Sequence, residues 1–213
     1  MIDLYYIPGA ASMAPHVVLE EVGAGYRLVR VSRQDGRVEP PEFVRLSPHG
    51  RVPLFVDGDL VMSESAAIVM HLCDLHPESE LAPGVGTPDR AQWYRWLTYL
   101  TNTVQATFMI AFYPERATSD PAGVDAVKAK AESDLAGMRD FLETELATGG
   151  PYLLGQRFTS ADIFLFMLTR WGRRLEPKWW DQRELGAHFR RVYERPAVQR
   201  VWEQQGLDPW ESG

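Results

Sequence analysis

The chain has 213 residues, of which 45% are hydrophobic and 24% are charged, and its formal net charge is -7. This size allows a hydrophobic core in one large domain or in two smaller ones. The negative charge argues against nucleic acid or an anionic membrane as a partner, because phosphate groups repel an acidic protein that has no concentrated basic patch. The single cysteine, Cys73, excludes an internal disulfide. No apolar run reaches the roughly 18 residues of a membrane span, so we expect a cytoplasmic protein.

The first 77 residues predict a mixed α/β unit. Short runs rich in β-branched and aromatic residues predict four strands, at 2–7, 26–32, 52–56 and 60–62. Apolar residues at helical spacing predict a helix between the first two strands, with Pro15 in its first turn and an end at Gly23. The last two strands are joined across Asp57-Gly58-Asp59, which is typical of a hairpin, and "ESAAIVMHLCDLH" after them has the period of a helix.

The rest of the chain predicts helices only. Residues 78–88 contain two prolines and two glycines and suit a linker. Helical periods then recur in four segments, which are 89 to about 111, 121 to 149, a stretch that starts in "FTSADIFLF", and about 184 to 204. Thr159 and Asp162 fit a capping box for the third of these helices. We therefore expect a first domain at 1–77, a linker at 78–88 and an all-helical domain at 89–213.

Four motifs, in this order, resemble those of the glutathione transferases: "YYIPGAASMAPH", "GRVPLFVDGDLVMSESAAIVMHL", "GQRFTSADIFLF" and "ERPAVQ". Together they span nearly the whole chain, and the first is most similar to the bacterial beta class. The resemblance implies a thioredoxin-like N-terminal domain and an all-α C-terminal domain. It also implies a homodimeric detoxification enzyme that conjugates glutathione, its co-substrate, to a small electrophilic substrate. We expect no nucleic acid, membrane or metal partner.

The resemblance also implies which residues bind glutathione. The main chain of Val52, exposed by a cis bond to Pro53, would pair with the cysteinyl part of the ligand, as a peptide adds to a sheet edge. Glu64 and Ser65, at the start of a helix, would bind the γ-glutamyl group. The residues alone are equally consistent with an ordinary trans turn at Pro53 and with a helix cap by Ser63 or Ser65.

The resemblance assigns activation of the glutathione thiol to Ser12. A thiol of pKa about 8.5 needs about 2.7 kcal/mol of thiolate stabilisation to ionise two pH units lower. A hydrogen bond to the charged sulfur, worth about 1.5 to 3 kcal/mol, and a helix N-terminus, worth roughly 0.3 to 2 kcal/mol, are together sufficient. Tyr6 or Tyr5 is the competing activator, backbone amides alone are a third possibility, and a plain helix cap is the structural alternative for Ser12.

Three positions depart from the beta-class pattern. Ala11 stands where relatives carry a cysteine, so no mixed disulfide with glutathione can form there. Gln105 replaces a histidine on the long helix after the linker and cannot titrate near neutral pH. A lysine that contacts the glycine carboxylate aligns near Gly36, which leaves Arg33 or Arg37 as replacements.

These departures keep two other functions open. One is a non-catalytic glutathione-binding or ligand-binding protein, and the other is a disulfide reductase that uses two glutathione molecules. The acceptor pocket implied by the resemblance lies between the domains and would be lined by Phe108, Phe112, Tyr113 and Trp171. Aromatic residues at helical spacing are also typical of a helix core. The five histidines have no metal-ligand spacing, so we expect no metal.

Overall fold

The structure is a computed structural model that describes residues 1–34 and 37–208, with side chains described outside 33–39. Packing divides the chain into two compact units. The first comprises Met1–Ala82 and the segment that begins at Tyr193, and the second comprises Pro83–Val192. These units are groups of residues that pack together, and they are not a test of domain boundaries. The domain limits expected from the sequence therefore stay predictions.

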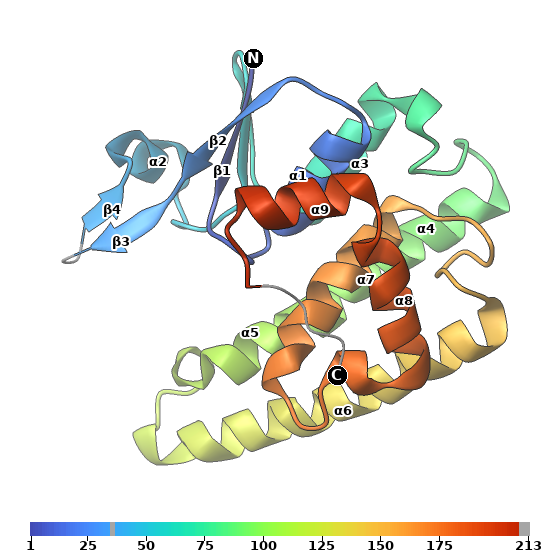
Figure 1. Ribbon diagram of the computed structural model, residues 1–213. Helices are drawn as coiled ribbons and strands as arrows, with labels where there is room; N and C mark the ends of the chain where they lie inside the picture. The colour runs from blue at the N-terminus through green and yellow to red at the C-terminus, as the bar shows by residue number, and fades with distance from the viewer. Residues whose placement is uncertain (35–36, 209–213) are drawn as a thin grey trace. The chain divides into compact units, whose positions relative to one another are not determined.

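The first unit is built on a four-stranded mixed sheet (Figure 1). Its strands, in spatial order, are β2 (Tyr26–Arg30), β1 (Ile2–Tyr6), β5 (Leu54–Asp57) and β6 (Leu60–Met62). β1 runs parallel to β2 and antiparallel to β5, and the β5–β6 pair is the expected hairpin. In this register Tyr5 lies opposite both Val29 and Leu54. The predicted α/β unit is confirmed.

Helix α1 (Met13–Glu21) connects β1 to β2 and packs against both α3 (Ser65–Leu75) and α9 (Pro196–Gln204) (Figure 1). Seven of the nine α1 residues are buried, which is more than one helix face can supply. Partners on two sides explain this burial. The sequence placed α9 in the helical half of the chain, because periodicity says nothing about which distant helix a segment will meet.

A small layer that the sequence left as a connection lies beside the sheet. It consists of β3 (Ser32–Gln34), β4 (Arg37–Glu39) and α2 (Pro41–Leu46). Each element is too short for its period to be recognised. Phe43 of α2 is fully buried and its ring lies 5.7 Å from that of Tyr5, so this layer closes one side of the core.

The second unit is helical, as predicted. Its principal helices are α4 (Pro88–Tyr99), the π-helix η2 (Leu100–Gln105), α5 (Ala106–Phe112), α6 (Val124–Gly149), α7 (Ser160–Trp171) and α8 (Arg183–Tyr193). The expected single helix from Asp89 to about Ala111 is thus interrupted by a π-helical turn, which the apolar period does not reveal. The expected final helix is two helices, because Pro196 lacks the N–H needed inside a helix and suits the first position of α9.

Helix α7 is the centre of the second unit, and all twelve of its residues are buried. The predicted capping box is confirmed: Thr159 and Asp162 satisfy each other's backbone at the start of the helix. Asp162 also accepts hydrogen bonds from the Leu153 N–H at 2.8 Å and from His188 Nε2 at 3.2 Å. Across the two described stretches, 1–34 and 37–208, no helix is long and apolar enough to cross a membrane.

Candidate functional site

The turn that leads from β1 into α1 runs from Ile7 to Ser12. Gly9 has φ +67°, a conformation that side chains disfavour. The Ser12 hydroxyl folds back onto Ile7, accepting from its N–H at 3.4 Å and donating to its carbonyl oxygen at 3.3 Å. Ser12 is fully buried and makes no cap bond to α1. Both distances are long for a hydroxyl, so these bonds hold the Ser12 side chain weakly.

The start of α3 is tied directly to this turn. Ser65, the first residue of α3, donates a 2.9 Å hydrogen bond from its hydroxyl to the carbonyl oxygen of Ala11. Ser65 is buried, whereas Glu64 before it is exposed and has φ +70°. The hydroxyl of Ser65 therefore joins the beginnings of two helices, and the simple cap expected of it does not form.

Val52 and Pro53 lie at the same edge of the sheet as the turn. The Val52-Pro53 bond is cis, as the resemblance implied, and Pro53 is buried while Val52 is partly exposed. Because β1 and β5 are antiparallel with Tyr5 opposite Leu54, the end of β1 and the start of β5 are adjacent. The Ile7–Ser12 turn, the Val52-Pro53 pair and the start of α3 thus meet in one place.

Tyr6 is the last residue of β1 and is 8% exposed. Its ring lies 6.4 Å from that of His16, on the first turns of α1. The carbonyl oxygen of Tyr6 accepts from the Val31 N–H at 2.8 Å. Tyr6 is therefore close in sequence to the turn, but its side chain belongs to the packed interior.

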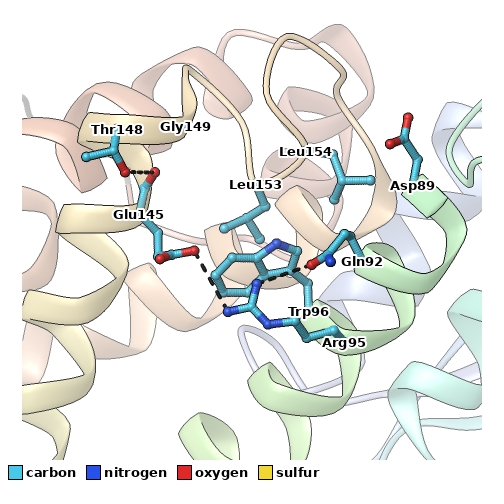
Figure 2. Close-up of a pocket in the computed structure, with 9 residues that line it drawn as sticks. All are labelled: Asp89, Gln92, Arg95, Trp96, Glu145, Thr148, Gly149, Leu153 and Leu154. Atoms are coloured by element: carbon cyan, nitrogen blue, oxygen red, sulfur yellow. Dashed lines mark hydrogen bonds and ion pairs between the residues drawn. The ribbon is translucent and has the colours of Figure 1, made fainter.

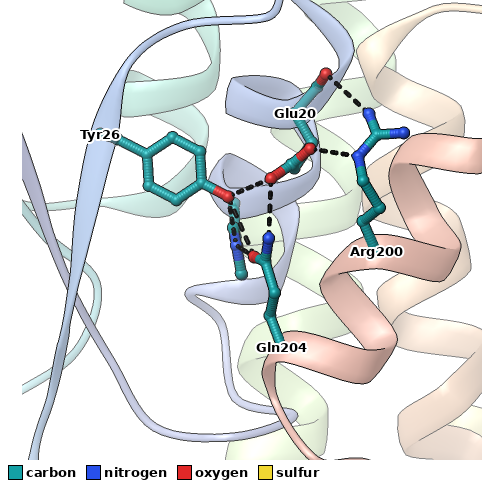
Figure 3. Close-up of polar contacts among 5 residues, drawn as sticks. Glu20, Tyr26, Arg200 and Gln204 are labelled. Carbon is teal, nitrogen blue, oxygen red and sulfur yellow. Dashed lines mark hydrogen bonds and ion pairs between the residues drawn. The ribbon is translucent and has the colours of Figure 1, made fainter.

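A polar network connects α1 and β2 to α9, and no pattern in the sequence indicated its extent. His16 Nε2 lies 2.8 Å from Gln204 Oε1 and 2.9 Å from the Tyr26 hydroxyl. Figure 3 shows the Glu20 carboxylate surrounded by the Tyr26 hydroxyl, the Gln204 amide and the Arg200 guanidinium, all hydrogen-bonded to it. The Arg200 Nε to Glu20 Oε2 distance is 2.6 Å.

The protonation states in this network follow from its burial and its hydrogen bonds. Burial lowers the pKa of His16 to about 4, against smaller opposing effects from Gln204 and Glu20. Burial and the neighbouring Glu20 raise the pKa of Tyr26. Burial opposes ionisation of Glu20, but the hydrogen bonds from Tyr26, Arg200 and Gln204 hold its pKa below the usual range. At neutral pH the network therefore contains a neutral imidazole, a protonated phenol and a carboxylate.

Gln105 and Arg37, two of the expected glutathione contacts, are outside the segments that meet at the Ile7–Ser12 turn within the first unit. Gln105 is the last residue of the π-helix and is partly exposed, with no hydrogen bond from its side chain to another described residue. The backbone of Arg37 pairs with that of Gln34 in the β3–β4 ribbon. Gly36 and the side chains of Arg33 and Arg37 lie outside the described residues.

The aromatic residues expected to line an acceptor pocket are brought together within the second unit. Phe112 lies 5.5 Å from Phe108 and 6.0 Å from Trp171, ring centre to ring centre. Trp179 joins them at 5.0 Å from Phe108. Phe108 and Trp179 are fully buried, Trp171 is 7% exposed, Phe112 is partly exposed and Tyr113 is 40% exposed. Only Phe112 and Tyr113 therefore present much ring surface to a ligand.

A surface pocket of about 230 Å³ also lies in the second unit, and none of the predicted site residues lines it. Figure 2 shows the Arg95 guanidinium over Trp96, 4.4 Å from the ring centre, between Gln92 and Glu145. The Arg95 to Glu145 ion pair is loose, at 3.8 Å. Within the described part of the chain, no group of three or more His, Cys, Asp or Glu side chains could hold a metal ion.

Comparison with known proteins identifies the family. The sequence profile described as "Glutathione S-transferase, N-terminal domain" matches residues 1–74, and "Glutathione S-transferase, C-terminal domain" matches residues 99–196. The chain belongs to the glutathione S-transferase family. The resemblance inferred from the four motifs is thereby confirmed.

Individual relatives agree over nearly their whole length. Glutathione S-transferase GstA of Escherichia coli O157:H7 is 31% identical over 96% of this chain and 98% of the relative. A bacterial beta class glutathione S-transferase from Sphingomonas chungbukensis is 30% identical, with a TM-score of 0.85 over 97% of this chain and 100% of the other. A sphingomonad glutathione S-transferase complexed with glutathione gives the same identity, TM-score and coverage. The predicted enzyme class and fold are confirmed.

Proposed function

We propose that the chain conjugates the thiol of glutathione to small electrophilic compounds, as a cytoplasmic homodimer with a detoxifying role, and that Ser12 activates the thiol. The observation that carries the proposal is the convergence of three segments on one turn. The Val52-Pro53 pair, the start of α3 and the Ile7–Ser12 turn meet at one edge of the sheet. The solved sphingomonad relative is complexed with glutathione, which supports the same ligand here.

Ser12 is suited to stabilising a thiolate because its hydroxyl lies at the start of α1. Rotation of the O–H away from the Ile7 carbonyl oxygen breaks one long donated bond, of 3.3 Å, and the oxygen can still accept from the Ile7 N–H. The rotated O–H makes a charge-assisted bond to sulfur. Such a bond is worth about 1.5 to 3 kcal/mol, and the positive end of the helix adds to it. The thiol proton leaves to solvent, the thiolate attacks the electrophilic carbon, and a C–S bond forms as the leaving group departs with its electron pair.

The remaining proposed contacts are those that the family resemblance implies. The main chain of Val52 would pair with the cysteinyl part of glutathione, and Glu64 would take the γ-glutamyl ammonium. The hydroxyl proton of Ser65 is already donated to Ala11, so Ser65 would bind the γ-glutamyl carboxylate through its backbone N–H. Arg37 and Gln105 are proposed at the other end of glutathione, with Phe112, Tyr113, Phe108 and Trp171 forming the acceptor side.

One observation favours a second candidate, a glutathione-binding protein without transferase activity. The Ser12 side chain is fully buried and its only proton points to the Ile7 carbonyl oxygen. If this bond persists when glutathione binds, the thiol receives no hydrogen bond from Ser12 and stays protonated at neutral pH. The fold and the binding contacts would be unchanged.

Melting temperature and conjugation rate separate these two functions. Glutathione at millimolar concentration should raise the melting temperature of the wild type and of Ser12→Ala alike, since the hydroxyl contributes to activation rather than to binding. The conjugation rate with 1-chloro-2,4-dinitrobenzene should fall by about 10- to 100-fold in Ser12→Ala, the equivalent of one hydrogen bond to a charged atom. Ser133→Ala, on the exposed face of α6, is the matched control and should keep the full rate.

Three outcomes would contradict the assignment. No rise in melting temperature would remove glutathione as the ligand. Binding without conjugation in the wild type would leave the non-catalytic protein. A full rate in Ser12→Ala together with a reduced rate in Tyr6→Phe would move thiol activation to Tyr6.

A further inference from the structure

Gln205, the residue that follows α9, lies between the turn and the His16 network. It is 4% exposed. Its Oε1 accepts a 2.8 Å hydrogen bond from the backbone N–H of Gly9, and its Nε2 lies 2.9 Å from His16 Nδ1. The side-chain amide of Gln205 thus bridges the Ile7–Ser12 turn and helix α1, although 196 positions separate it from Gly9.

The hydrogen bonds run from Gly9 through Gln205, His16 and Gln204 to Glu20. The groups at the two ends, the Gly9 N–H and the Glu20 carboxylate, determine which atom donates in each bond. A backbone N–H can only donate, so the oxygen of Gln205 must face Gly9 and its NH₂ group must donate to His16. His16 Nδ1 is therefore an acceptor and carries no proton. At the other end the Glu20 carboxylate can only accept, and it does so from Tyr26 and Gln204. The single imidazole proton is on Nε2, where Gln204 Oε1 and the Tyr26 hydroxyl lie within 2.9 Å.

The bond to Gly9 matters because Gly9 is the middle of the turn that ends at Ser12. Inside this turn the Ala10 N–H donates to the Ile7 carbonyl oxygen at 3.1 Å, and the Ser12 hydroxyl also bonds to Ile7. The Ser12 side chain bonds to Ile7, and the Ser12 carbonyl oxygen accepts from the His16 N–H at 3.1 Å. Two side chains outside the turn hold it, Ser65 of α3 at Ala11 and Gln205 at Gly9. Gln205 therefore contributes to where the Ser12 hydroxyl lies relative to α1.

We propose that Gln205 is a positioning residue for Ser12, and that an amide at this position keeps the turn insensitive to pH near neutrality. The proposal rests on the proposed role of Ser12 in thiol activation. A carboxylate in place of the amide would still accept from Gly9, but its second oxygen would face His16 Nδ1 as another acceptor. His16 would then take up a second proton, and the position of the turn would change with the protonation of its imidazole ring.

The groups around His16 bear on this expectation. Glu20 lies one turn further along α1, with Arg200 of α9 bonded to it, and Tyr26 belongs to β2. The Tyr6 ring of β1 lies 6.4 Å away, ring centre to ring centre. His71 of α3, which packs on α1, lies against Phe55. Arg200 is neutralised by Glu20, so a new carboxylate at position 205 would be the charge in direct contact with His16.

The test compares Gln205→Glu and Gln205→Leu with Gln199→Glu and Gln199→Leu, which change an exposed glutamine within α9. The pKa of His16 is read from its ring nitrogen shifts by NMR, and hydrogen exchange of the Gly9 amide reports the turn. We expect Gln205→Glu to raise the pKa of His16 into the neutral range and to introduce a step near that pH into the kcat/KM profile with glutathione and 1-chloro-2,4-dinitrobenzene. The Gln199 variants should behave as the wild type.

Gln205→Leu should speed exchange of the Gly9 amide and lower kcat by about tenfold, the equivalent of one lost hydrogen bond, with a smaller change in KM for glutathione. A Gly9 amide that stays protected, or an unchanged pKa of His16 in Gln205→Glu, would overturn the proposal. So would a full kcat in folded Gln205→Leu. If even the wild type fails to conjugate glutathione, the proposed function fails instead, and the NMR readings still decide whether Gln205 holds Gly9 and His16.

Discussion

At the scale of single residues, His16 shows how burial and function are connected in the first unit. It is fully buried and neutral, and its proton is on Nε2 because Gln205 donates to Nδ1. His16 ends the first motif, and its partners Gln204 and Gln205 come from the far end of the chain. No periodicity or spacing in the sequence could have paired them.

The buried neutral His16 predicts a pH dependence of stability. Its pKa falls from 6.5 in the unfolded chain to about 4 in the folded one. Between these values the unfolded state binds more protons than the folded state. The contribution of His16 to the free energy of unfolding is therefore complete above pH 6.5 and is lost as the pH falls towards 4. The loss amounts to about 3 kcal/mol at 1.36 kcal/mol per unit.

Urea unfolding followed by tryptophan fluorescence at several pH values between 7 and 4 measures this loss. The fall in the free energy of unfolding should be smaller in His16→Gln, by up to about 3 kcal/mol, because glutamine does not titrate. His49→Gln removes an exposed histidine. Its free energy of unfolding should fall with pH as that of the wild type does. Parallel curves for the wild type and His16→Gln would contradict this prediction, because they would mean that His16 has the same pKa in the folded and the unfolded chain.

At the scale of elements, the start of α7 was the feature best predicted from sequence. The capping box needs only Thr159 and Asp162 at a spacing of three, which is local information. The same carboxylate also binds Leu153 and His188, and these longer-range contacts could not be read from the sequence. Short elements such as β3, β4 and α2 and the π-helical turn before α5 were missed, since three to six residues carry too little pattern.

Asp162 should therefore be worth more than an ordinary helix cap. Asp162→Ala leaves the buried donors of Thr159 and His188 and the partly buried N–H of Leu153 without their acceptor. We expect it to lower the free energy of unfolding by about 3 to 5 kcal/mol. Asp134→Ala, which removes an exposed carboxylate paired with Lys130 on α6, should change it little. Equal losses in the two variants, measured by denaturant unfolding, would contradict the role assigned to Asp162.

At the scale of the whole molecule, the Ile7–Ser12 turn, the Val52-Pro53 pair and the start of α3 all belong to the first unit. The four motifs and their order predicted the α/β unit, the helical unit and the family. They also indicated the three segments that meet at the Ile7–Ser12 turn. They did not show that the segment after Tyr193 packs with the first unit, because that contact depends on tertiary structure rather than on local pattern.

The location of these three segments in the first unit predicts where glutathione will protect the backbone. Hydrogen exchange with and without millimolar glutathione should slow at residues 7–12, 52–54 and 64–66 of the first unit. The pocket around Arg95 and Trp96 in the second unit should show no change. Protection confined to that pocket would contradict the placement of the ligand on the first unit.

The most direct test of the central claim is the pKa of the glutathione thiol in the bound state. It is measured from the ultraviolet absorbance of the thiolate as a function of pH, in the wild type and in Ser12→Ala. We predict a pKa about two units below the usual 8.5 in the wild type, and a return by about one to two units towards 8.5 in Ser12→Ala. An equally low pKa in both proteins would contradict thiol activation by Ser12.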